Sequence, residues 1–235
     1  MTPNSLPAMS SRVKAKSFTT LLSLFVLFSM ILVACGGGTS QNNQSANKHI
    51  LKVAAQSYDF AQSGFNIYNG HPNAGLGLIY ETLYFVDVNG GSFTPMLATN
   101  YQWNSDNTQV TFTIRQNVKW NDGQPFTAND VAFTFNLMKQ YPAADGLGVW
   151  SFLSTVTAPD SNTVVMTFQK AYPPVLVNIA GHVYIIPQHV FATVGDPTKY
   201  LTDKPVGTGP FTLAKYQTDL AVYDKNSNYW QADKV

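Results

Sequence analysis

The sequence has few charged residues and almost no cysteine. One cysteine and one glutamate, Cys35 and Glu81, occur in 235 residues, and charged residues make up 11% of the chain. The 14 basic side chains nearly balance the 13 acidic ones, which argues against a protein that binds nucleic acid by neutralising phosphates. With a single cysteine the chain forms no internal disulfide, so a folded domain must be held together by its core.

Apolar side chains are abundant instead. Hydrophobic residues reach 45% and aromatic residues 13% of the chain, enough to bury a sizeable core and to exclude a disordered scaffold. The length allows one large or two small domains.

The N-terminal segment has the pattern of an export signal. Basic side chains between residues 12 and 16 precede an apolar run, 18–34, which ends in Leu-Val-Ala directly before Cys35. A basic start, an apolar centre and small residues at the cut are typical of a signal peptide. A Gly/Ser/Asn/Gln-rich stretch follows Cys35 and predicts a flexible tether.

Two interpretations of this segment are open. A mostly apolar run of seventeen residues is marginal for an uncleaved transmembrane helix. The ending resembles the lipobox of bacterial lipoproteins, in which Cys35 would be acylated and become the new N-terminus. We therefore predict a lipoprotein signal peptide over 1–34, a tether over 35–47 and attachment to the outer face of the cytoplasmic membrane, where two acyl chains give stable anchoring.

The remaining chain has a mixed α/β pattern. Alternating apolar and polar residues predict strands over 110–114 and 164–168, and the first of these is expected to run on to Trp120. A first strand over 49–54, an extended segment over 84–88, a short helix from Pro173 and a hairpin over 211–223 complete the pattern. Leu76, Ile79, Tyr80 and Leu83 have helical spacing and predict a short helix.

The segment after Thr127 fits both periods, because its apolar residues alternate and also share one helical face. Thr127 can cap a helix, Asp130 lies three positions later, and Tyr141-Pro142 would stop it. These end signals favour a helix. Before it, Asn121-Asp122-Gly123 predicts a tight turn.

Catalytic patterns are weak. A Gly-x-Ser-x-Gly nucleophile motif does not occur. His182 and His189 are separated by Pro187 without a nearby carboxylate, so no metal site is predicted. Gly207-Thr208-Gly209 lacks the further glycine or lysine of a phosphate loop. The residues alone predict an exported binding or interaction module without a cofactor, and not an enzyme.

Several motifs resemble one family in the order expected for it. They are Ile-Tyr-Glu-Thr-Leu at 79–83, Leu-Ala-Thr-Asn-Tyr at 97–101, Val-Lys-Trp-Asn-Asp-Gly-Gln-Pro-Phe-Thr at 118–127, Pro-Val-Gly-Thr-Gly-Pro-Phe at 205–211 and Asn-Ser-Asn-Tyr-Trp at 226–230. Together they look like family 5 of the bacterial extracellular solute-binding proteins, the oligopeptide-, dipeptide- and nickel-binding components of ABC importers. One departure is Asn121, where members often carry histidine.

The resemblance implies a fold and an organisation. Members are two-lobed clamshells, and this sequence resembles the N-terminal lobe only, without the second lobe. The implied first lobe covers about 48–88 and 185–235, with an inserted subdomain at about 89–184. The chain would then be an incomplete solute-binding domain.

The resemblance also implies a function. A substrate-binding lipoprotein would capture peptides, or a related solute such as a nickel chelate, and deliver them to ABC permease subunits. The alternative is a surface interaction or sensing lipoprotein that has lost transport.

Four residues are candidates for the ligand site by the same resemblance. Tyr58 and Asp59 follow the first strand, where relatives line the cleft. Trp150 falls near a pocket tryptophan of nickel-binding relatives, and His182 near their arginine for an anionic chelate. A histidine in that place would make an anion contact pH-dependent.

Overall fold

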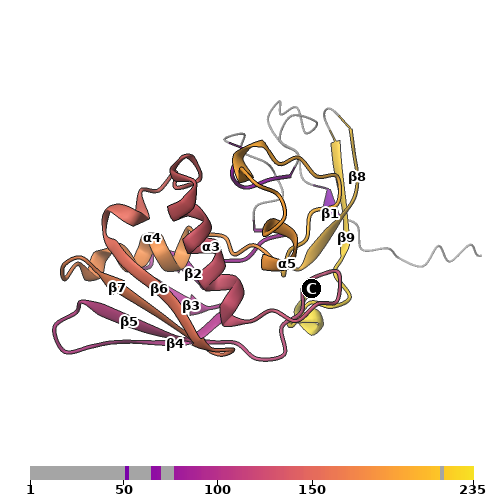
Figure 1. The fold of residues 1–235 in the computed structure, drawn as a ribbon. Helices are drawn as coiled ribbons and strands as arrows, with labels where there is room; N and C mark the ends of the chain where they lie inside the picture. Colours follow the sequence, from indigo (N-terminus) through magenta and orange to yellow (C-terminus); the bar gives the residue numbers. More distant parts are fainter. Residues whose placement is uncertain (1–50, 53–64, 70–76, 218–219) are drawn as a thin grey trace, which may run out of the picture. The chain divides into compact units, whose positions relative to one another are not determined.

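A four-stranded antiparallel sheet organises the central part of the chain (Figure 1). A computed structural model describes residues 51–52, 65–69, 77–217 and 220–235. In the order β4-β5-β7-β6, the strands of this sheet are Ala98–Trp103, Gln109–Ile114, Thr163–Phe168 and Leu153–Asp160. On β5 and β7 every second side chain is buried, which is the alternation that the sequence predicts for a sheet with one covered face.

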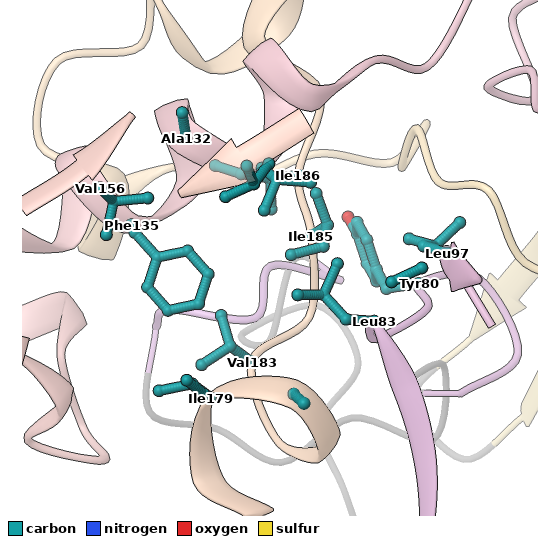
Figure 2. Close-up of a cluster of buried hydrophobic side chains, with 14 of the residues drawn as sticks. Tyr80, Leu83, Leu97, Ala132, Phe135, Val156, Ile179, Val183, Ile185 and Ile186 are labelled. Atoms are coloured by element: carbon teal, nitrogen blue, oxygen red, sulfur yellow. The ribbon is translucent and has the colours of Figure 1, made fainter. Parts of the chain in front are cut away.

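Helix α3, Ala128–Gln140, packs against strands β6 and β7 of this sheet. Its residues Val131, Phe135 and Met138 are buried, and Phe135 has no exposed surface. Figure 2 shows Phe135 close to Val156 of β6, with Val183 and Ile179 on the other side of the same cluster. The core therefore joins this sheet to the segment around residue 180.

The ends of α3 are fixed by the residues that the sequence singles out. The Thr127 side chain accepts a hydrogen bond from Asn129 N at 3.3 Å, and the Asp130 carboxylate accepts one from Thr127 N at 2.9 Å. This reciprocal pair satisfies backbone donors that a helix start leaves free. Tyr141 ends the helix, directly before Pro142. The predicted helix is confirmed.

There are two smaller antiparallel sheets among the described residues, and the first of them joins segments distant in sequence. The first has the order β1-β9-β8, with strands Leu51–Lys52, Leu220–Lys225 and Phe211–Gln217. The second is the hairpin of β2, Tyr84–Asp87, and β3, Ser92–Pro95. The described parts of the first strand, of the extended segment and of the C-terminal hairpin are thus confirmed.

Short helices lie between the strands and after β9. They are η1 Pro142–Ala144, η2 Val149–Ser151, η3 Pro173–Val175, α4 Leu176–Gly181, α5 Gln188–Phe191, η4 Pro197–Lys199 and η5 Ala232–Lys234. Three of them, η1, η3 and η4, begin at a proline, whose fixed φ suits a first helical turn.

The prediction of a short helix around Ile79 is wrong for the described residues. From Gly77 onward they form turns and a bridge. Their carbonyl groups accept hydrogen bonds from distant backbone instead. Ile79 O accepts from Gly209 N at 2.8 Å, and Glu81 O accepts from Ile185 N at 3.0 Å. The helical spacing of the apolar residues reflects burial on several sides.

The strand predicted to run on to Trp120 is also shorter than expected. It ends at Ile114, and Asn117 has a left-handed φ of 61°, which breaks an extended ladder. The turn at Asn121-Asp122-Gly123 is present, and Gly123 has a φ of 90°.

The chain is of mixed α/β class, as predicted, and residues 48–235 form one compact unit. The division into a first lobe and an inserted subdomain stays a prediction, and its boundary near residue 88 falls in the turn of the β2–β3 hairpin. In the part of the chain that the structure describes, no helix has the length and apolarity needed to cross a membrane.

Candidate functional site

A cavity of about 340 Å³ opens between the end of α3 and the segment that follows α4. One wall consists of Met138, Ala143, Ala144, Gly146 and Leu147. The other consists of Ile67, Tyr68, His182, Val183 and Tyr184. Its volume lies in the range of small-molecule sites, which are mostly apolar with a few polar groups.

Of the two predicted ligand residues that the structure describes, His182 lines this cavity and Trp150 does not. His182 directly follows α4, and its Nδ1 lies 3.0 Å from the carbonyl oxygen of Val177. A carbonyl only accepts hydrogen bonds, so Nδ1 carries a proton and donates it. Nε2 of His182 is then the ring nitrogen that remains for a ligand, as an acceptor in the neutral ring.

Trp150 does not line the cavity. Its indole Nε1 donates to the carbonyl of Phe135 at 2.8 Å, and Lys139 Nζ lies 4.3 Å from the centre of its ring. Both contacts fix the ring against α3. Trp150 is nevertheless tied to the cavity wall, because the Asp145 carboxylate accepts from the backbone nitrogens of Val149 and Trp150 at 2.9 and 3.0 Å.

The remaining predicted site residues, Cys35, Tyr58 and Asp59, lie outside the described residues. Within the described ranges, no group of three or more His, Cys, Asp or Glu side chains could hold a metal ion.

Sequence reasoning missed a buried polar cluster around Glu81. This carboxylate is 3% exposed and accepts hydrogen bonds from the Tyr229 hydroxyl at 3.2 Å and from Trp230 Nε1 at 3.2 and 3.1 Å. Burial raises its pKa to about 7 from 4.5, while its hydrogen-bond donors and the positive charge of Arg115 lower it. Its being the single glutamate was the only signal in the sequence.

Gly207 and Gly209 allow their backbone to pack closely against another backbone segment next to this cluster. A Cβ on Gly207 would overlap the carbonyl oxygen of Ile79, and a Cβ on Gly209 would overlap that of Leu78. Only glycine allows this approach. These contacts favour a structural role for Gly207-Thr208-Gly209. The sequence points the same way, because it lacks the further glycine or lysine of a phosphate loop.

A family model for the bacterial extracellular solute-binding proteins, family 5 (middle region), matches residues 92–235. The chain belongs to this family. The matched range includes α3 and the cavity residues from Met138 to Tyr184.

Curated relatives of this family 5 chain are solute-binding proteins. The dipeptide-binding protein of Escherichia coli K12 is 29% identical over 175 residues, which cover 65% of this chain and 32% of the relative. Heme-binding protein A of Haemophilus influenzae is 26% identical over 250 residues, covering 93% of this chain and 45% of the relative.

A solved structure gives the same result for the fold. The crystal structure of a periplasmic oligopeptide-binding protein of an oligopeptide ABC transporter from Thermotoga maritima superimposes with a TM-score of 0.68 and 29% identity. The superposition covers 77% of this chain and 34% of that protein. The chain thus spans from about a third to just under half of the length of these relatives.

Proposed function

We propose that this family 5 chain is the solute-capturing component of an ABC importer, with peptides as its solute class. The observation that carries the proposal is the family match over residues 92–235, which contains most of the wall of a ligand-sized cavity. Two relatives, a dipeptide-binding protein and an oligopeptide-binding protein, favour peptides.

In this proposal His182 contacts the solute through its free Nε2, while Trp150 supports the cavity wall through Asp145. Tyr58 and Asp59 would complete the site. The captured solute would be handed to permease subunits in the membrane.

A ligand library tests solute capture. Binding to the folded state raises the melting temperature, because the ligand adds RT ln(1 + [L]/Kd) to the free energy of unfolding. We expect some members of a set of di- to hexapeptides at millimolar concentration to raise it, and matched free amino acids to raise it less. A flat response to peptides, heme and nickel chelates would contradict solute capture and favour a surface interaction protein.

We propose in addition that the chain is exported and lipid-anchored through Cys35. The Leu-Val-Ala-Cys ending of the apolar run supports this. Expressed in a bacterium, the protein should fractionate with membranes and incorporate labelled fatty acid, and Cys35→Ala should lose the label. Label that persists in Cys35→Ala would disprove the lipid anchor.

A further inference from the structure

The described wall of the cavity beside His182 consists mainly of apolar residues. Of the ten described residues that line it, none is an acid, a lysine or an arginine, and the polar side chains among them are those of His182 and two tyrosines. Burial raises the pKa of both lining tyrosines, Tyr68 and Tyr184, which therefore remain neutral phenols.

Charged side chains close to the wall are held in other contacts. Asp145 lies between two lining residues, but its two carboxylate oxygens accept from the backbone nitrogens of Val149 and Trp150. Lys139 follows the lining residue Met138, but its ammonium group lies over the Trp150 ring and donates to Ser154 O at 3.3 Å. Neither Asp145 nor Lys139 is among the described residues that line the cavity.

The apolar part of the wall is substantial. Met138, Ala144 and Val183 are buried, with exposed fractions of 4% to 7%. Leu147 lies at the rim and is 47% exposed. An apolar ligand group that covers Leu147 and fills the space gains from leaving water. A carboxylate or ammonium group in the same place would lose much of its hydration without meeting a side chain of opposite formal charge among the described lining residues.

From this arrangement we propose that the cavity selects an uncharged apolar side chain of the solute, of leucine or phenylalanine type, and rejects acidic and basic ones. This proposal rests on the proposed function and specifies the peptide class. Leu147 is its specificity-determining residue, because it lies at the rim and contributes apolar surface that is free to be covered.

The test uses four N-acetylated, C-amidated tripeptides, Ala-X-Ala with X as Leu, Phe, Asp or Lys, which differ only in the middle side chain. Saturation-transfer NMR with the full chain measures weak dissociation constants and identifies the ligand protons in contact. We expect Leu and Phe peptides to bind at least ten-fold more tightly than Asp and Lys peptides, with saturation strongest on the middle side chain.

Two variants place the selectivity in the cavity. Leu147→Asp should lower affinity for the Leu and Phe peptides at least ten-fold. Leu201→Asp is the matched control, because Leu201 is 58% exposed and does not line the cavity, and it should leave all four affinities unchanged. Circular dichroism checks that both variants are folded.

The outcomes separate this inference from the proposed function. Equal binding of all four peptides, or a preference that Leu147→Asp leaves intact, would overturn the apolar selection while solute capture stands. The same holds if no blocked peptide binds but free peptides raise the melting temperature. Absence of binding in both experiments would overturn the proposed function and this inference with it.

Discussion

The Glu81 carboxylate accepts hydrogen bonds from the indole Nε1 of Trp230, a residue 149 positions further along the chain. Arg115 completes the cluster, because its guanidinium carbon lies 3.9 Å from the centre of the Trp230 ring. An acid, a base and an aromatic ring from three distant segments therefore meet, with Glu81 buried and Arg115 and Trp230 half-buried. Such a cluster links the C-terminal segment to the rest of the unit.

The raised pKa of Glu81 makes stability depend on pH. A carboxyl whose pKa is about 7 when folded and about 4.5 when unfolded binds protons more tightly in the folded state. Its favourable contribution is complete below pH 4.5 and is lost as pH rises through 7, a change of about 3 kcal/mol. We expect urea unfolding at pH 5 and pH 8 to show this decrease in the wild type, and Glu81→Gln to remove most of it. Equal pH dependence in both proteins would contradict the assignment.

Local signals explain which elements the sequence predicted well. The start of α3 depends on Thr127 and Asp130, which act within one helical turn, and the β5 strand depends on alternation within six residues. Both signals are complete within a short window, so a pattern reveals them.

Non-local bonds explain what the sequence did not predict. The backbone carbonyl groups around Ile79 accept hydrogen bonds from Gly209 N and from the backbone of other distant residues. A short stretch of sequence does not contain that information. The Glu81 cluster was missed for the same reason. His182 was singled out through resemblance rather than through a local pattern, and it lines the cavity, whereas Trp150 does not.

Removing the cap of α3 should weaken the fold by a moderate amount. In Thr127→Ala the backbone nitrogen of Asn129 loses its side-chain acceptor, and such losses cost about 1 kcal/mol. Thr127→Ser keeps the hydroxyl and is the control, with a free energy of unfolding close to wild type. Urea denaturation measures both, and equal destabilisation in the two variants would show that the lost methyl group matters rather than the cap.

The turn at Gly123 should resist β-branched substitution. Gly123 has a φ of 90° and open space around its Cα, so Gly123→Val meets backbone strain and not a clash. We expect a loss of about 1 kcal/mol or more in the free energy of unfolding. Gly146→Val is the control, because that position is equally open and does not have a positive φ. Wild-type stability in Gly123→Val would remove the role assigned to the turn.

The glycine at 209 should be more sensitive than either of those positions. A methyl group in Gly209→Ala would overlap the carbonyl oxygen of Leu78 and push the two segments apart, including the bond from Gly209 N to Ile79 O. Overpacking of this kind costs about 2 kcal/mol. Thermal unfolding should therefore show a lower melting temperature for Gly209→Ala than for Gly146→Ala, in which the added carbon meets nothing within 4 Å. The same melting temperature in both would mean that the backbone contact relaxes at little cost.

Arg115 should set the pH at which the Glu81 cluster loses stability. Its positive charge lowers the pKa of Glu81, so Arg115→Gln should raise that pKa further and deepen the loss of stability between pH 5 and pH 8. The variant also loses the bond from Arg115 Nε to Met96 O, but that loss is the same at both pH values and cancels in the comparison. Arg115→Lys keeps the charge and should keep the wild-type pH dependence. In a Glu81→Gln background Arg115→Gln should change stability equally at pH 5 and pH 8, since the titrating partner is gone. A pH-dependent effect that persists in that background would assign the coupling to another acid.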